Sequence, residues 1–287
     1  MIRVISRVHA FLKNRTKLIR KRSAYRFKIF LKYHLNRKEK ESVFIIATRR
    51  TGSNLLLDYL NSIPNVSFAP EILNKSMAYG IRRRLISKKA VLRHIDYSIN
   101  NCKYKTCGTK LIMAHLEYHQ ITLEDLKHRF PKARFIILYR RSILDQFISL
   151  KIAEATDTWH WTDQFCLPSS IRVRVPTLLD YCRKIKGFYE TLFSHEWLKE
   201  RSIVLSYEAL VESPQEIFKQ TVFPFLGLSD SRIAAAAKKQ NTKALHEIVQ
   251  NHKELVRWIK DPLTTQDYSF SREEQDDSMR ELRTMAG

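Results

Sequence analysis

One short polar stretch combines the residue types that bind phosphate-like anions, namely Arg49, Arg50, Thr51, Gly52, Ser53 and Asn54. It follows the apolar run 42–48 and opens the helical pattern of 53–62. The N-terminus of a helix offers unpaired backbone N–H groups and the positive end of a dipole. Gly52 permits a backbone with positive φ that turns N–H groups inward, while the arginines add permanent charge. We therefore predict an anion-binding loop at this position. The alternative is an ordinary serine N-cap with solvated arginines.

The loop differs from the phosphate loop of nucleoside triphosphatases. The Walker pattern requires an earlier glycine and a lysine directly after the second glycine, and the segment around Gly52 has neither. No acidic residue at a strand end provides a clear magnesium ligand. These features weaken the interpretation as a small-molecule kinase, which we keep as an alternative function, and they favour a site without a metal.

A second pair of residues has the chemistry to bind another phosphate. Arg141 follows the apolar run 134–139, and Ser149 lies eight residues further along the chain. Eight residues are about two turns of a helix. Because open α/β sheets bind ligands at the carboxyl ends of their strands, we expect this pair to meet a ligand there. The alternative is a charged turn with a solvated serine.

The elements that must position these residues alternate along the chain. We predict strands over 42–48, 106–113, 134–139 and 202–207, and helices over 53–62, 75–101, 123–129, 142–155, 177–200, 213–226 and 231–257, with a loop over 156–176. Strands that alternate with helices imply parallel β-α-β units in one sheet. The pattern predicts a single doubly wound α/β domain over residues 42–287, preceded by an extension of residues 1–41.

The charge of the chain is strongly positive and unevenly distributed. Of its 287 residues, 51 are Lys or Arg and 29 are Asp or Glu, which gives a formal net charge of +22. Fourteen of the basic residues but only two acidic ones fall within residues 1–41, so more than half of the excess lies in this extension. Such a surplus predicts an anionic partner. The extension fits either a basic amphipathic helix on an anionic membrane or a solvated basic arm.

The cysteines and the apolar runs bear on the compartment. Cys102, Cys107, Cys166 and Cys182 are few and scattered, so we expect neither a disulfide framework nor a metal site. No uninterrupted apolar run reaches the length of a membrane-spanning helix, and the first 35 residues lack the apolar core of a signal peptide. We expect a cytoplasmic protein in a reducing setting.

Together the two motifs resemble those of the sulfotransferases that use 3′-phosphoadenosine 5′-phosphosulfate (PAPS), especially the bacterial carbohydrate branch with its nodulation-factor and trehalose sulfotransferases. The loop 50–54 matches the 5′-phosphosulfate loop of the family, with Arg50 where many relatives carry lysine. Arg141 and Ser149 match its 3′-phosphate pair and spacing. Further likenesses follow in family order at 70–74, 108–111, 207–210, 225–228 and 239–243. The resemblance implies a P-loop-NTPase-like parallel sheet flanked by helices, the sulfotransferase fold.

The resemblance also implies a reaction. A sulfuryl group would pass in line from PAPS to an acceptor hydroxyl or amine, leaving PAP as the product. Arg50 would stabilise the charge that develops on the leaving phosphate oxygen without a metal. Glu71 would act as the general base and His115 is the alternative base. Glu71 is otherwise interpreted as a carboxylate that begins a helix after Pro70, and His115 as a surface residue.

Further binding roles come from the same resemblance. Tyr207 would contact the adenine and Lys243 would reach the 3′-phosphate, although Tyr207 is equally compatible with the core and Lys243 with solvent. The acceptor would be a glycan or another small molecule. A basic protein that binds nucleic acid or an anionic membrane is the rival function. We expect no specific nucleic acid, because the chain carries no zinc finger or recognisable RNA-binding signature. The extension 1–41 would instead provide peripheral contact with the inner face of the membrane.

Overall fold

The computed structural model describes residues 40–74, 87–159, 170–235, 245–258 and 261–268. Its centre is a parallel sheet in the strand order β2-β3-β1-β4-β5. The strands are β1 (Glu41–Ala47), β2 (Val66–Ala69), β3 (Thr106–Ile112), β4 (Arg134–Tyr139) and β5 (Ser202–Ser206). The predicted α/β class with a parallel sheet is confirmed. Residues 1–39, nearly all of the basic extension, lie outside the described residues.

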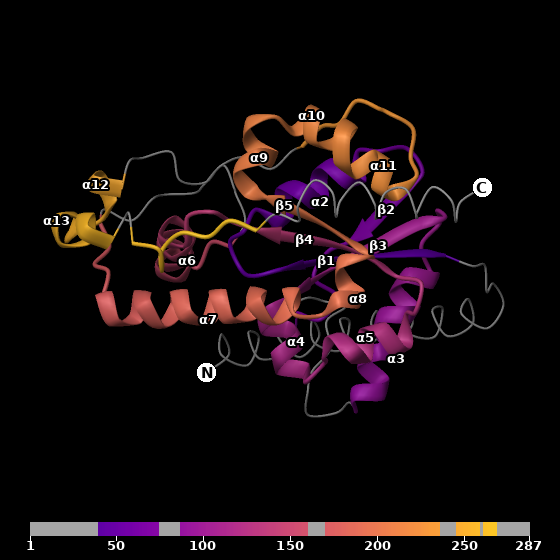
Figure 1. Ribbon diagram of the computed structural model, residues 1–287, viewed down its shortest axis with the longest axis horizontal. Helices are drawn as coiled ribbons and strands as arrows, with labels where there is room; N and C mark the ends of the chain where they lie inside the picture. The colour runs from indigo at the N-terminus through magenta and orange to yellow at the C-terminus, as the bar shows by residue number, and fades with distance from the viewer. Residues whose placement is uncertain (1–39, 75–86, 160–169, 236–244, 259–260, 269–287) are drawn as a thin grey trace, which may run out of the picture.

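Helices cover both faces of the sheet (Figure 1). One layer contains α2 (Ser53–Asn61), α9 (Tyr207–Glu212), α10 (Pro214–Ile217), the π-helical turn Phe218–Val222 and α11 (Phe223–Leu226). The other contains α3 (Lys88–Asn100), α4 (Met113–His119), α5 (Leu123–Arg129), α6 (Ile143–Thr156), α7 (Val175–Phe193) and α8 (Glu196–Lys199), with α12 (Leu245–Ile248), α13 (His252–Leu255) and the 3-10 turn Val256–Trp258 beyond the end of the sheet.

The apolar run of β1 explains why two layers are needed. Phe44 and Ile46 pack into the core on the side of α3 and α7, while Val43, Ile45 and Ala47 pack on the side of α2. All five side chains are fully buried. A strand that buries both faces is apolar throughout rather than alternating.

The order of the strands places the anion-binding loop at a crevice. β1 lies between β3 and β4: β2 and β3 lie on one side of β1, and the chain then crosses to β4 and β5 on the other side. Ligands of open α/β sheets bind at the carboxyl ends of the strands where the order reverses in this way. The loop between β1 and α2 leaves the sheet at that point (Figure 1).

Some element predictions were wrong. β2 and α4 are short and were not predicted, and the predicted helix 177–200 is interrupted at Ser194 and His195. Residues 231–235 are not helical. The side chain of Gln215 holds this segment instead: it donates to the carbonyl of Ser231 at 2.9 Å and accepts from the N–H of Ile233 at 3.2 Å.

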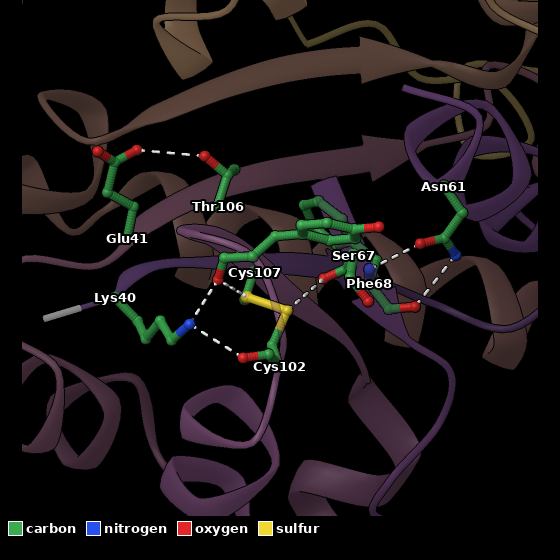
Figure 2. The surroundings of a disulfide bond; sticks show 9 residues. Lys40, Glu41, Asn61, Ser67, Phe68, Cys102, Thr106 and Cys107 are labelled. Carbon is green, nitrogen blue, oxygen red and sulfur yellow. Dashed lines mark hydrogen bonds between the residues drawn. A yellow bond between two sulfur atoms is a disulfide. The ribbon is translucent and has the colours of Figure 1, made fainter. Parts of the chain in front are cut away.

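The sequence predicted no disulfide framework and a reducing setting, but one pair of cysteines is bonded. Figure 2 shows the bond between Cys102, in the turn after α3, and Cys107 in β3. The tight turn brings the two Cα atoms to 6.2 Å, a usual separation for a disulfide. Lys40, just before β1, donates to the carbonyls of Cys102 and Tyr104 at 2.9 and 2.7 Å. Since disulfides persist in oxidising compartments, the cysteines no longer argue for a reducing one.

Within the described ranges, no helix combines the length and apolar character that crossing a bilayer requires.

Candidate functional site

The loop between β1 and α2 has the backbone of an anion cradle. Arg50 and Gly52 both adopt positive φ, 64° and 79°, so the chain curls tightly before α2 begins at Ser53. Thr51 is buried, and its hydroxyl donates to the carbonyl of Thr48 at 2.9 Å, which holds the curl closed. Gly52 caps α2 without a side chain, so the positive end of the helix dipole meets the loop. The predicted positive φ of Gly52 is confirmed.

Tyr207 packs directly on this loop. A Cβ atom placed on Gly52 would lie 2.3 Å from Cδ2 of Tyr207, so no other residue fits there without displacing the ring. The guanidinium of Arg140 lies 4.8 Å from the centroid of the same ring. Tyr207 is the first residue of α9 and follows β5 directly. Through this ring the end of β5 contacts the anion loop at Gly52 and the end of β4 at Arg140.

Arg50 joins the two predicted phosphate motifs. Its Nε donates to Oγ of Ser149 on α6 at 3.0 Å, and its Nη1 donates to the carbonyl of Trp159 at 2.9 Å. Burial lowers the pKa of Arg50, and the neighbouring Arg140 lowers it further. Arginine nevertheless stays protonated in proteins, so the site keeps this charge.

Arg49 is the exposed arginine of the loop. Its side chain is exposed and lies 6.0 Å from the ring centroid of Trp159. Gln146 fixes the backbone beside it by donating to the carbonyl of Arg49 at 2.6 Å and to Oγ1 of Thr48 at 2.7 Å. Arg49 and Trp159 therefore lie together at the exposed side of the loop, which we call the mouth of the site.

A buried lysine connects the loop to the predicted base. Lys110 of β3 is 1% exposed, and its Nζ lies 3.1 Å from Oε1 of Glu71 and donates to Oδ1 of Asn54 in the first turn of α2. Asn74 donates to Oε2 of Glu71 at 2.9 Å. Burial would raise the pKa of Glu71, but Lys110 and Asn74 outweigh it and hold that pKa below its ordinary value. Glu71 is therefore a carboxylate at neutral pH.

His115 of α4 lies beside the same carboxylate. Its Nε2 is 3.9 Å from Oε2 of Glu71, and its Nδ1 is buried without a hydrogen-bond partner among the described residues. Burial lowers the pKa of His115, Glu71 opposes this shift, and Arg49 reinforces it. The imidazole is consequently neutral at pH 7 and, like Glu71, able to accept a proton.

Arg141 stands apart from the loop. Its backbone N–H donates to Oε2 of Glu208 at 3.0 Å, and its half-exposed side chain places Nε 4.0 Å from Oδ1 of Asp267. Ser149 contacts Arg50 rather than Arg141. Lys243 lies outside the described residues.

The structure adds residues that the sequence analysis left out of the site. Lys110 is the clearest example, and the sequence contained a sign of its role. A charged residue inside an apolar strand must be paired when the strand is buried. Arg140 Nε, Tyr181 Oη and Gln146 Oε1 are buried without hydrogen-bond partners in the described part of the chain. Of these groups, Arg140 Nε and Tyr181 Oη are donors that suit an anionic molecule, whereas Gln146 Oε1 is an acceptor.

No family model matches the chain. A sulfotransferase from Alicyclobacillus acidocaldarius covers 77% of this chain and 91% of its own, with a TM-score of 0.48 and 14% identity. A mouse sulfotransferase solved with PAP covers 69% of this chain and 62% of its own, with a TM-score of 0.42 and 15% identity.

Nodulation protein H of Rhizobium meliloti, a sulfotransferase, is 25% identical over 223 residues, which are 74% of this chain and 88% of that protein. The same protein from strain 1021 is 25% identical over 222 residues. The aligned length extends well beyond the two phosphate motifs. With the parallel sheet and the ordered motifs already described, the chain is similar to a sulfotransferase over 74% of its length, and this similarity supports a sulfotransferase enzyme.

Proposed function

We propose that this sulfotransferase takes its sulfuryl group from PAPS and transfers it to a hydroxyl or amine of a carbohydrate or another small molecule. The observation that carries the proposal is the chain of contacts from Asn54 through Lys110 to Glu71, because it joins a loop suited to anions to a carboxylate suited to deprotonate an acceptor. Sulfuryl transfer requires these two functions to be adjacent.

The residues present fit the donor. Backbone N–H groups at the start of α2 and the guanidinium of Arg50 suit the 5′-phosphosulfate. Arg141 is our proposed ligand of the 3′-phosphate, and Ser149, which accepts from Arg50, would join it there. Tyr207 provides an aromatic ring next to the loop for the adenosine moiety. When bound, PAPS supplies the sulfuryl group, whose S–O bond to the phosphate breaks as a bond to the acceptor oxygen or nitrogen forms. Arg50 would stabilise charge on the phosphate that leaves, so we propose a reaction without a metal ion.

Glu71 is our proposed general base. Its Oε atoms take the acceptor proton, and Lys110 and Asn74 keep it ionised and oriented before the reaction. His115 is the second candidate, since a neutral imidazole 3.9 Å from Glu71 is also able to accept a proton. The two assignments differ in which variant loses turnover.

The mouth of the site suits a ring-shaped acceptor. Trp159 is 38% exposed and lies against Arg49, so it offers a flat apolar surface with a charged group beside it. Sugar rings pack their apolar faces on such surfaces while their hydroxyls bind polar neighbours. This arrangement supports a carbohydrate acceptor.

The basic extension bears on the location and the partners of the protein. We propose that residues 1–41 form a basic extension to a catalytic domain of residues 42–287, and that the extension contacts anionic lipid at the inner face of the membrane from the cytoplasm. Its fourteen basic residues support attraction to anionic lipid. We propose no specific nucleic acid partner.

The direct test is a calorimetric titration with PAP in EDTA and moderate salt, with ADP as the control. We expect PAP to bind at least tenfold more tightly than ADP, because a phosphate bound by arginine contributes about 1.5–3 kcal/mol. Absence of PAP binding by folded protein would overturn the proposal. Binding of ATP that requires magnesium would favour the kinase alternative.

A further inference from the structure

The segment of residues 261–268, which we call the C-terminal strap, adds a short antiparallel pairing to the end of β4. The N–H of Ile143 donates to the carbonyl of Thr264 at 2.8 Å, and the N–H of Gln266 donates to the carbonyl of Arg141 at 2.9 Å. Thr264 is fully buried and Gln266 is 8% exposed. The strap therefore belongs to the folded core at the point where Arg141 emerges.

The two ends of this pairing are also fixed. The side chain of Gln266 donates to the carbonyl of Arg140 at 2.8 Å. The ring of Tyr268 packs against Tyr139, Tyr189 and Phe193, with centroid distances of 5.2, 5.2 and 4.9 Å. The strap is thus held by backbone, amide and aromatic contacts on both sides of Asp267.

This anchoring places the carboxylate of Asp267 beside Arg141. The buried Tyr139 hydroxyl donates to Oδ1 of Asp267, and the same carboxylate oxygen lies 4.0 Å from Nε of Arg141. Burial would lower the pKa of Arg141, but Tyr139, Asp267 and Glu208 outweigh it and raise that pKa. The contacts restrain a side chain that is otherwise half-exposed.

We propose that Asp267, oriented by Tyr139, is a positioning residue that holds Arg141 ready for the 3′-phosphate of the nucleotide, and that the C-terminal strap is part of the nucleotide site. The inference rests on the proposed function, because Arg141 is its proposed 3′-phosphate ligand. An arginine that is restrained before binding loses less conformational freedom when the phosphate arrives, and affinity rises accordingly. The effect is confined to ligands that carry the 3′-phosphate.

The test compares PAP with 5′-AMP, which lacks only the 3′-phosphate, by calorimetry on the full chain. Asp267→Asn removes the charge but keeps an acceptor for the Tyr139 hydroxyl, and Tyr139→Phe removes that hydroxyl. We expect the Kd for PAP to rise roughly three- to tenfold in both variants while the Kd for 5′-AMP stays constant. Asp180→Asn on α7 removes an equally exposed carboxylate and is the control, with no change expected.

Each outcome decides the inference. A specific loss of PAP affinity with unchanged urea midpoints supports positioning. Unchanged or tighter PAP binding in Asp267→Asn, or equal weakening of both nucleotides, overturns the inference while the preference of the wild type for PAP leaves the proposed function intact. If the wild type itself binds PAP no better than 5′-AMP, the proposed function fails, and the inference fails with it.

Discussion

Lys110 shows how much of the chemistry of the candidate site depends on single side chains. It is nearly without solvent contact, yet it carries a charge that Glu71 and Asn54 contact directly. A buried charge without its partner is strongly destabilising, so the three residues form one unit rather than three independent groups. Substitutions at this unit therefore need variants that preserve shape.

Glu71→Gln tests the base at constant shape. We expect kcat to fall by roughly 10²- to 10⁴-fold, because the amide cannot accept the acceptor proton, while the Kd for PAP stays within about twofold. The measurement is steady-state turnover alongside calorimetry, with Glu117→Gln on the exposed side of α4 as the control. Retained turnover would transfer the role to His115, which His115→Gln then examines in the same assay.

Lys110→Met tests the ionisation of Glu71. Lys110 lowers the pKa of Glu71, whereas burial raises it. Removal of the Lys110 charge should therefore raise the pKa of Glu71. A base works only above its pKa, and the acidic limb of the kcat/KM profile is therefore expected to move to higher pH. Lys184→Met, which breaks an exposed pair with Glu117, is the control. A limb that stays in place would show that Glu71 is not the group titrating.

At the scale of elements, short connections place the site residues. The turn before α2 requires positive φ at Arg50 and Gly52, and the turn between α3 and β3 is closed by the disulfide. Both turns adjoin β1 or its neighbour β3, so both fix the central part of the sheet. Each is testable with a substitution that changes only the turn.

Gly52→Ala is expected to disrupt the anion loop. The new Cβ would meet the ring of Tyr207 at 2.3 Å, in addition to the strain of positive φ. Gly227→Ala is a matched control, because φ there is 64° and no atom lies within 4 Å of the added Cβ. Left-handed φ alone costs about 1–2 kcal/mol, so only Gly52→Ala should also weaken PAP binding, by roughly tenfold or more. Equal effects of the two variants on PAP affinity would contradict the cradle.

The disulfide is expected to stabilise the fold. Reduction of the unfolded protein should release two further thiols, from Cys102 and Cys107. The double substitution of both residues by serine should lower the free energy of unfolding by about 2 kcal/mol, since the closed loop is short. Urea denaturation with thiol counting measures both quantities. An unchanged thiol count upon reduction would exclude the bond in solution.

At the scale of the whole molecule, more than half of the excess positive charge lies in residues 1–41. Twelve of the 22 excess positive charges come from residues 1–41. Attraction to an anionic membrane is worth about 1 kcal/mol per basic residue near the surface and is screened by salt. We expect the extension to bind the anionic membrane and the rest of the chain to carry out turnover.

Neutralisation of Arg20, Lys21 and Arg22 by glutamine tests this division. We expect sedimentation with phosphatidylserine vesicles to weaken roughly 100-fold at low salt, from about 3 kcal/mol of lost attraction, with kcat unchanged. Neutral phosphatidylcholine vesicles and high salt are the controls. Binding to neutral vesicles as tight as to anionic ones would contradict the electrostatic mechanism.

The sequence by itself determined the main strands and the anion loop. The runs around Phe44 and Ile136 are continuously apolar because both of their faces are buried, and such runs are visible without coordinates. Gly52 was identifiable because its local geometry admits few other residues. β2 and α4 were not, because β2 has only four residues and α4 follows β3 without a break, so neither shows a pattern of its own.

Only the tertiary structure decided which of these residues meet. Lys110 and Glu71 come from different strands or turns, and their ion pair exists because β2 and β3 are adjacent in the sheet. Asp267 reaches Arg141 across 126 residues because the C-terminal strap pairs with the end of β4. Local propensity acts within a few residues, whereas these contacts arise from long-range packing, and for that reason the sequence named the loop but not the partners that complete the site.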